Sequence, residues 1–236
     1  MGRRKKGEDD SVARERLTDK IGELFFARGL FSFTMDEISR FFHVSKKTLY
    51  RFFPTKEDMI LHVSNIFASR IEAFVQRRLK EIEDKGPVAF VPLITALIGR
   101  FGSILLSVPA SLFVELESKS PLIYARIDHI RSSIVKNNFG RILESGKRMG
   151  KIRPDVDTGI VSHIYTGMLR QILSRQGLEP AYAPYDVYLT AVKILFEGVL
   201  APEGKREFRP DSLPVFSAEN LWERIRSDGE ERPAAQ

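Results

Sequence analysis

The sequence contains no cysteine among its 236 residues. This absence excludes a disulfide framework and every zinc, iron–sulfur or nucleophilic site that depends on a cysteine thiolate. Long apolar runs are scarce as well. The two longest uncharged runs, residues 86–99 and 101–114, are shorter than the roughly 18 apolar residues of a membrane-spanning helix, and Arg100 separates them. We therefore expect no membrane partner.

Targeting signals and catalytic motifs are also missing. The basic start at residues 3–6 runs into the acidic residues 8–10, so that no apolar signal core follows, and we expect a cytoplasmic protein. We find no Gly-rich phosphate loop, no His-Glu-x-x-His and no Gly-x-Ser-x-Gly. His129 and His163 lack metal-ligand spacing, and we interpret them as structural. The sequence predicts no enzyme, no metal site and no cofactor.

Positive charge, in contrast, is present in excess and is unevenly distributed. The net charge of +6 comes from 37 Lys and Arg against 31 Asp and Glu. Residues 1–56 hold 13 of these cations and 8 of the acids, whereas residues 57–236 hold 24 and 23. Such asymmetry indicates a polyanion-binding head on a neutral body, although a solvated basic tail gives the same composition.

The basic segment is predicted to begin with an amphipathic helix over residues 12–28. Its apolar residues recur at i, i+4, i+7 and i+8, which is the spacing of one helix face. Gly29 closes the helix, because glycine readily takes positive φ. Residues 1–11 are predicted to be a flexible basic tail that either reaches DNA or is merely solvated. The apolar face of the helix over residues 12–28 consists of Leu17, Ile21, Leu24 and Phe25.

Two shorter helices follow, joined by a turn of three or four residues. Thr34 and Glu37 form a capping box at the start of the first helix. Ser45 is the candidate N-cap of the second helix, which Pro54 ends. This order predicts a helix-turn-helix whose second helix lies in the major groove of DNA. A surface helix with a solvated lysine pair is the alternative. The first helix is expected to bury Ile38, Phe41 and Phe42.

Two segments of this region, TMDEI at residues 34–38 and VSKKTLYRFFPTKE at residues 44–57, resemble the N-terminal signature of the TetR/AcrR family of bacterial transcriptional regulators. The resemblance covers roughly residues 13–60. It departs at the turn, where His43 replaces the usual glycine and Phe42 replaces the small residue before it. Histidine tolerates positive φ better than a β-branched residue does, so we expect the turn to be kept.

The resemblance implies a set of contacts with double-stranded DNA. It makes Thr34 a helix cap whose backbone meets phosphate, and it makes Lys46 and Lys47 the leading base readers. Lysine in this position favours guanine, which offers the O6 and N7 acceptors. The other implied contacts, to phosphates or along the DNA backbone, are Ser45, Thr48, Tyr50, Arg51 and Lys56.

The rest of the chain is predicted to be helical, so that the fold class is all-α. A connector helix starts at Lys56 and ends near Gly86, and the next helix starts near Pro92. Residues 113–124 and 144–155 are loosely similar to the regulatory domains of TetR-like proteins. The predicted domains are a basic tail (1–11), a helix-turn-helix domain (12–56), a ligand-binding and dimerisation domain (57–200), and a Pro-containing linker with a short helix near 217–226 (201–236).

Two helices near residues 156–175 and 186–200 carry continuous apolar stripes. The resemblance implies that they pair with their two-fold mates in a homodimer, since a symmetric pair of heads reads the two halves of a palindrome. The alternative is that both helices only complete the core of the monomer.

The resemblance also implies a small-molecule effector inside the body. Apolar residues dominate the segments that would wall its pocket, which favours a hydrophobic or aromatic effector. Arg100 is a candidate handle for an anion, or a surface cation paired with Glu115 or Glu117. The other pocket candidates can equally be core residues. The candidates are Phe90, Arg100, Phe101, Phe113, Tyr124, Phe139, Tyr165 and Met168.

The sequence therefore predicts a ligand-responsive repressor that binds a palindromic operator as a homodimer. A helical protein-interaction module with only non-specific DNA affinity is the alternative. A steep fall in affinity with rising salt would discriminate DNA binding from an enzyme and from an interaction module whose head has lost DNA contact, because phosphate neutralisation releases counterions.

Overall fold

The computed structural model describes residues 3–28, 33–107, 110–174, 181–209 and Trp222. For residues 3–9, 26–28, 101, 103–107, 110–113 and 173–174 the description is limited to the backbone. The described residues form ten helices and one isolated antiparallel bridge, which confirms the all-α prediction. The helices are α1 (Arg3–Arg28), α2 (Met35–Phe41), α3 (Lys46–Phe52), α4 (Lys56–Lys85), α5 (Pro87–Ser107), α6 (Ala110–Lys119), α7 (Pro121–Arg148), α8 (Thr158–Ser174), α9 (Pro184–Val199) and α10 (Pro202–Glu207).

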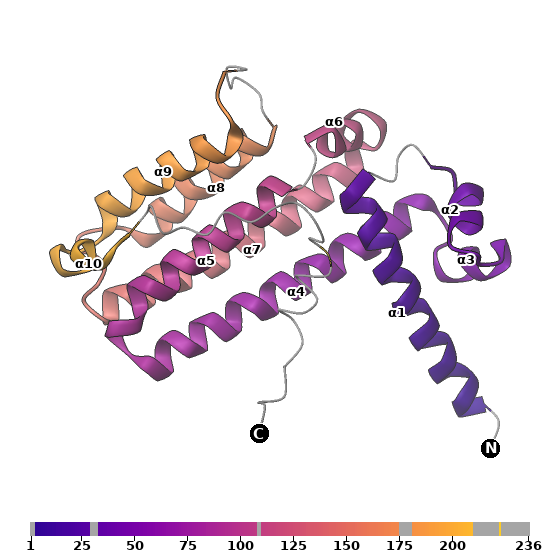
Figure 1. Ribbon diagram of the computed structural model, residues 1–236, viewed down its shortest axis with the longest axis horizontal. Coiled ribbons are helices and arrows are strands. Elements are labelled where there is room, and N and C mark those ends of the chain that lie inside the picture. Colours follow the sequence, from indigo (N-terminus) through magenta and orange to yellow (C-terminus); the bar gives the residue numbers. More distant parts are fainter. Residues whose placement is uncertain (1–2, 29–32, 108–109, 175–180, 210–221, 223–236) are drawn as a thin grey trace.

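Figure 1 shows a small head at one end, made of α2, α3 and part of α1, and a larger helical body. The connector α4 runs from the head along α7, and these two helices form the long axis of the body. Helix α7 also packs on α8, which packs on α9. The buried face of α4 is continuous from the head to the body and includes Ile60, Val63, Ile71, Val75, Leu79 and Ile82.

The caps of the helix-turn-helix are formed as predicted. The Thr34 hydroxyl accepts a hydrogen bond from the Glu37 backbone N–H at 3.2 Å, and the Glu37 carboxylate accepts one from the Thr34 N–H at 2.7 Å. At the start of α3, the Ser45 hydroxyl accepts the Thr48 N–H at 3.0 Å. These bonds satisfy backbone donors that a helix start otherwise leaves unpaired.

The turn between α2 and α3 depends on His43, whose φ of 54° lies in the left-handed region. It is the one described residue other than glycine with such a φ. Two hydrogen bonds hold the turn across it: the Val44 N–H donates to the Ser39 carbonyl at 3.0 Å, and the Ser39 hydroxyl donates to the Val44 carbonyl at 2.9 Å. The turn is kept without glycine, as predicted.

Two features of the head differ from prediction. Helix α1 begins at Arg3, so that residues 3–11 of the predicted flexible tail are helical. Cations at residues 4–6 stand four positions before acids at residues 8–10, and opposite charges at this spacing favour a helix. Phe41, predicted to be buried, is 52% exposed, because α2 ends there and its ring lies edge-on to the Phe42 ring at 5.0 Å.

Two features of the body also differ. Helix α5 begins at Pro87 rather than near Pro92, which lies inside the helix at an exposed position. Gly86, with a φ of 75°, makes the sharp turn, and Pro87 is suited to a first helical position. Part of the predicted linker is the short helix α10. Apart from Trp222, the helix predicted near residues 217–226 lies outside the described residues.

Helix α10 is attached to the body by a buried amine. Lys151 is 3% exposed, and its Nζ donates to Glu207 at 2.6 Å and to Glu203 at 3.4 Å. The hydrogen bond with Glu207 raises the pKa of Lys151 despite its burial. Directly after α10, the Phe208 ring stacks on Phe196 of α9 at 5.5 Å. The segment from α10 to Phe208 is therefore packed onto the core.

Substituting His43 tests the left-handed turn. A β-branched side chain is strongly disfavoured at positive φ, so His43→Val should lower the free energy of unfolding by about 1–2 kcal/mol. The control His43→Gly should change it by less than about 1 kcal/mol, because glycine takes this conformation without a steric cost. Urea unfolding followed by circular dichroism measures both, and an unchanged midpoint for the valine variant would contradict a fixed left-handed turn.

Candidate nucleic-acid interface and ligand site

The outer face of α3 is basic and exposed. Leu49 on its inner face is fully buried, as is Phe53 just beyond the helix. The polar side chains are thereby turned outward, and Tyr50 is 45% exposed. A helix that enters a groove needs its polar side chains on the face opposite its buried one. The exposed residues on this face are Lys46, Lys47, Tyr50 and Arg51.

Two carboxylates of the head are paired with this face. The Lys46 Nζ lies 2.5 Å from an Asp36 oxygen, and the Arg51 guanidinium lies 2.9 Å from an Asp10 oxygen. Lys47 makes no ion pair with any residue that the structure describes. Exposed ion pairs contribute little to stability, so phosphates or bases can replace these carboxylates at small cost. Of the two lysines that begin α3, Lys47 is the one already available.

Lys56 lies where the head joins the body. It is the first residue of α4, directly after the cap in which Thr55 accepts the Asp58 N–H at 3.0 Å. Burial lowers the pKa of the Lys56 amine, and the nearby Glu57 and Glu115 offset this only in part. Backbone N–H groups at a helix start favour an anion, which suits the implied phosphate contact.

A polar seam joins α4 to α7 in the middle of the body. Its centre is Asn138, which is 3% exposed. The Asn138 Nδ2 donates to the Glu72 carboxylate at 2.6 Å, and its Oδ1 accepts from the Gln76 Nε2 at 3.0 Å. The Gln76 Oε1 in turn accepts from Arg141 at 2.6 Å. This seam fixes the register of the connector on the body.

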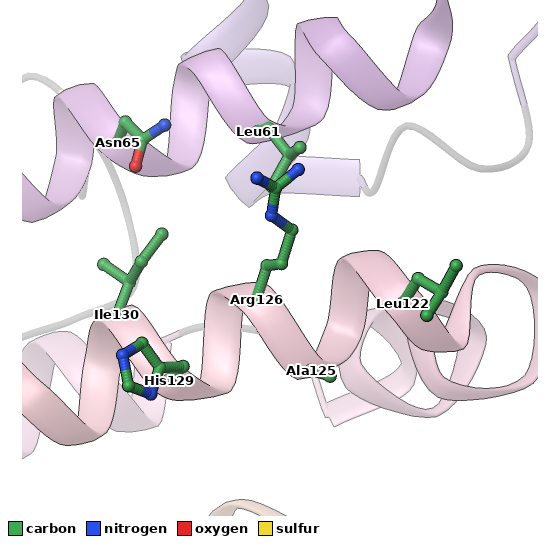
Figure 2. A pocket seen from close by; sticks show the side chains of 7 residues that line it. All are labelled: Leu61, Asn65, Leu122, Ala125, Arg126, His129 and Ile130. Carbon is green, nitrogen blue, oxygen red and sulfur yellow. The ribbon is translucent and has the colours of Figure 1, made fainter.

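Nearer the head, the same two helices line a hollow of about 730 Å³ that is open to solvent. Figure 2 shows the Arg126 side chain extending from α7 across the gap toward Leu61 of α4. Its lining combines apolar side chains with a guanidinium and an imidazole, a combination suited to an apolar molecule that carries an acidic group. The lining residues are Leu61, Asn65, Leu122, Ala125, Arg126, His129 and Ile130.

None of the predicted pocket residues lines this hollow. Phe90, Phe139 and Tyr165 are core residues, each less than 5% exposed. The rings of Phe139 and Tyr165 stack at 4.2 Å beside a cavity of only about 20 Å³, and burial raises the pKa of Tyr165 to about 12. Arg100, Tyr124 and Met168 are half-buried, and the side chains of Phe101 and Phe113 lie outside the described residues.

The family model of the bacterial regulatory proteins of the tetR family matches residues 17–63, from α1 into the first turns of α4. The chain belongs to the TetR family. The matched segment contains the capped turn and the basic face of α3. The family assignment therefore rests on the head, while the body of this TetR-family protein is compared through its fold.

Solved structures share the fold of this TetR-family protein. SmeT, the repressor of the Stenotrophomonas maltophilia multidrug efflux pump SmeDEF, is 15% identical with a TM-score of 0.59, over 85% of this chain and 95% of SmeT. A putative TetR-family transcriptional regulator from Mesorhizobium loti is 15% identical with a TM-score of 0.58, over 81% and 98% of the two chains. CprB from S. coelicolor is 17% identical with a TM-score of 0.53, over 93% and 98%. No curated protein matches the chain in sequence.

Arg126 and His129, which line the hollow, were not among the pocket residues predicted from the sequence. Leu122, Arg126 and Ile130 are spaced by four and mark one face of a helix, but this spacing does not reveal which helix stands opposite. Within the described residues, no helix is long and apolar enough to cross a membrane. In the same residues, no three acidic or histidine side chains are grouped to hold a metal ion.

The polar seam can be tested by truncating its centre. Asn138→Ala removes the hydrogen bonds that the buried Asn138 side chain makes with Glu72 and Gln76, so we expect the free energy of unfolding to fall by about 1–3 kcal/mol. The neighbouring Asn137 is exposed on the same helix, and Asn137→Ala is the matched control. Chemical unfolding of both variants measures the difference, and equal midpoints would contradict a stabilising seam.

Proposed function

We propose that this TetR-family protein is a transcriptional repressor that binds a palindromic operator as a homodimer and is released by a small apolar molecule. The observation that carries the proposal is the exposed basic face of α3, held by two capped helices within a head that matches the family. Repression would follow from occupation of the operator.

In the proposed complex with DNA, the contacting side chains of the head have two different roles. Lys46 and Lys47, at the start of α3, contact base edges and favour guanine. The remaining residues hold the duplex without reading it, because contacts to phosphate and sugar carry no direct sequence information. This second group comprises Thr34, Ser45, Thr48, Tyr50, Arg51 and Lys56.

The proposed dimer uses the outer faces of α8 and α9. The inner face of α8 is buried in the monomer core, whereas Ile160 and Ile164 on its outer face are 62% and 54% exposed. On the adjacent α9, Ile194 is 69% exposed. Apolar side chains clustered on neighbouring exposed helices favour an interface. Figure 1 shows both helices away from α2 and α3, which leaves the reading face open in a dimer.

The proposed effector site is the hollow between α4 and α7. A SmeT–triclosan complex, whose SmeT chain is 15% identical to this chain with a TM-score of 0.57, supports effector binding on this fold. A molecule in the hollow would push the Leu61 end of α4 away from α7, while the seam at Asn138 holds the middle of α4. Since Lys56 lies little more than one helical turn from Leu61, the displacement would reach the head.

Selection of binding sites from a random duplex library tests the DNA-binding function. We expect a palindrome with half-sites about one helical turn apart to be enriched by the wild-type protein. Lys46→Ala and Lys47→Ala should each relax the base preference, while Lys56→Ala should weaken all sequences alike and reduce the salt dependence. Only weak, salt-sensitive binding without an enriched sequence would favour the interaction-module alternative.

The effector site can be tested with the probe 1-anilinonaphthalene-8-sulfonate, which is apolar, aromatic and anionic. We expect the probe to bind with enhanced fluorescence and to release the selected operator. Ala125→Phe should obstruct the hollow and weaken both effects, and Arg126→Gln should weaken probe binding roughly tenfold by removing its counter-charge. Ala73→Phe, at an exposed position of α4, is the control. Unchanged probe binding in Ala125→Phe would rule out this hollow.

A further inference from the structure

The single tryptophan of the chain, Trp222, is buried between the head and the connector. It lies far along the sequence from both elements, yet it is only 1% exposed. Its neighbours come from α1, on the head side, and from α4. A C-terminal residue thus completes the junction on which the head is mounted.

Four interactions hold the indole in this junction. Its Nε1–H donates to the Asp19 carboxylate of α1 at 3.1 Å. Arg70 of α4 donates to the same carboxylate oxygen at 2.7 Å, and its guanidinium lies over the indole at 4.7 Å. The Phe67 ring of α4 stacks on the indole with centroids 6.4 Å apart and an interplanar angle of 18°. A hydrogen bond, a cation–π contact and an aromatic contact therefore meet on the indole, and the Arg70–Asp19 ion pair links two of its neighbours.

Helix α1 has a glycine, Gly22, at the point where it contacts the indole. A Cβ atom at Gly22 would lie 2.4 Å from the indole, so that only glycine permits the observed approach. Glycine inside a helix costs about 0.5–1 kcal/mol relative to alanine. Its presence in the middle of α1 is explained by the indole that it accommodates.

The segment that carries Trp222 is also anchored to the body. Phe208 is buried on Phe196 of α9, and Lys151 pairs with Glu207 of α10. Between this anchor and Trp222 lie residues outside the described ranges. The two anchors join the body at α9 to the junction of α1 and α4.

We propose that Trp222 is a positioning residue for DNA binding, which fixes α1 on α4 and thereby sets the orientation of the helix-turn-helix. This inference rests on the function proposed above. Helices α2 and α3 have only seven residues each, and α1 is the element of the head that packs along α4. If α1 moves on α4, the head is no longer preorganised for DNA binding. In a dimer, the distance between the two copies of α3 then varies.

Docking of the ring is tested first, without DNA, by acrylamide quenching of the fluorescence of Trp222. The wild-type protein should be poorly quenched, because the indole is buried. Gly22→Ala should expel the ring and raise the quenching constant severalfold, although alanine is the better helix former. Gly140→Ala is the matched control, since a Cβ there meets only an ordinary contact at 3.6 Å. Equal quenching in Gly22→Ala and wild type would overturn the docking.

Positioning is tested next with the selected operator and with versions whose half-sites are one base pair closer or farther apart. At temperatures well below unfolding, Gly22→Ala and Trp222→Ala should bind the operator roughly tenfold more weakly. They should also discriminate less between spacings, at an unchanged salt dependence. Trp222→Phe, which keeps a stacking ring, should restore part of the discrimination.

A merely structural role would lower the melting temperature while leaving the affinity and the spacing preference of the folded protein unchanged, and this result would overturn the positioning role. Failure of the wild-type protein to select any operator would overturn the proposed function and, with it, the role of Trp222 in DNA binding. The quenching experiment would still report whether the ring is docked, so that the two failures are distinguishable.

Discussion

The attachment of α4 to α7 through Asn138 is the constraint on which the rest of the structure depends. Among the described helices, the connector is the one that belongs to both the head and the body, so its register decides where each part lies. Apolar burial alone would permit small sliding of one long helix on another, because it is not directional. The hydrogen bonds from Asn138 to Glu72 and Gln76 are directional and hold one register.

The head end and the middle of α4 differ in how firmly they are held against α7. Around Asn138 the helices touch through a satisfied buried network, whereas toward the head they separate around the hollow at Leu61 and Arg126. A helix can transmit a displacement when one part of it is fixed and another part can move. In the proposed function, the same asymmetry would let a molecule in the hollow move the head without changing the head's own structure.

Local features of the fold were predictable from the sequence because short-range chemistry decides them. The caps at Thr34 and Ser45 and the left-handed turn at His43 each depend on residues within a few positions. The start of α1 and the place of Pro92 inside α5 were not predictable, since several competing helix starts fit the same sequence. The lining of the hollow and the partners of Trp222 depend on which helices meet, and periodicity alone does not contain that information.

The buried amine of Lys151 has a consequence for how the chain can be altered. Its counter-charges, Glu203 and Glu207, come from the chain after α9, and Phe208 from the same stretch covers Phe196. A polypeptide cut after Leu200 would keep a cation that solvent barely reaches and would uncover an aromatic ring. An uncompensated buried charge is far costlier than a lost surface segment. Residues 200–208 therefore belong to the folding unit, and a truncation that removes α10 and Phe208 would disrupt the core.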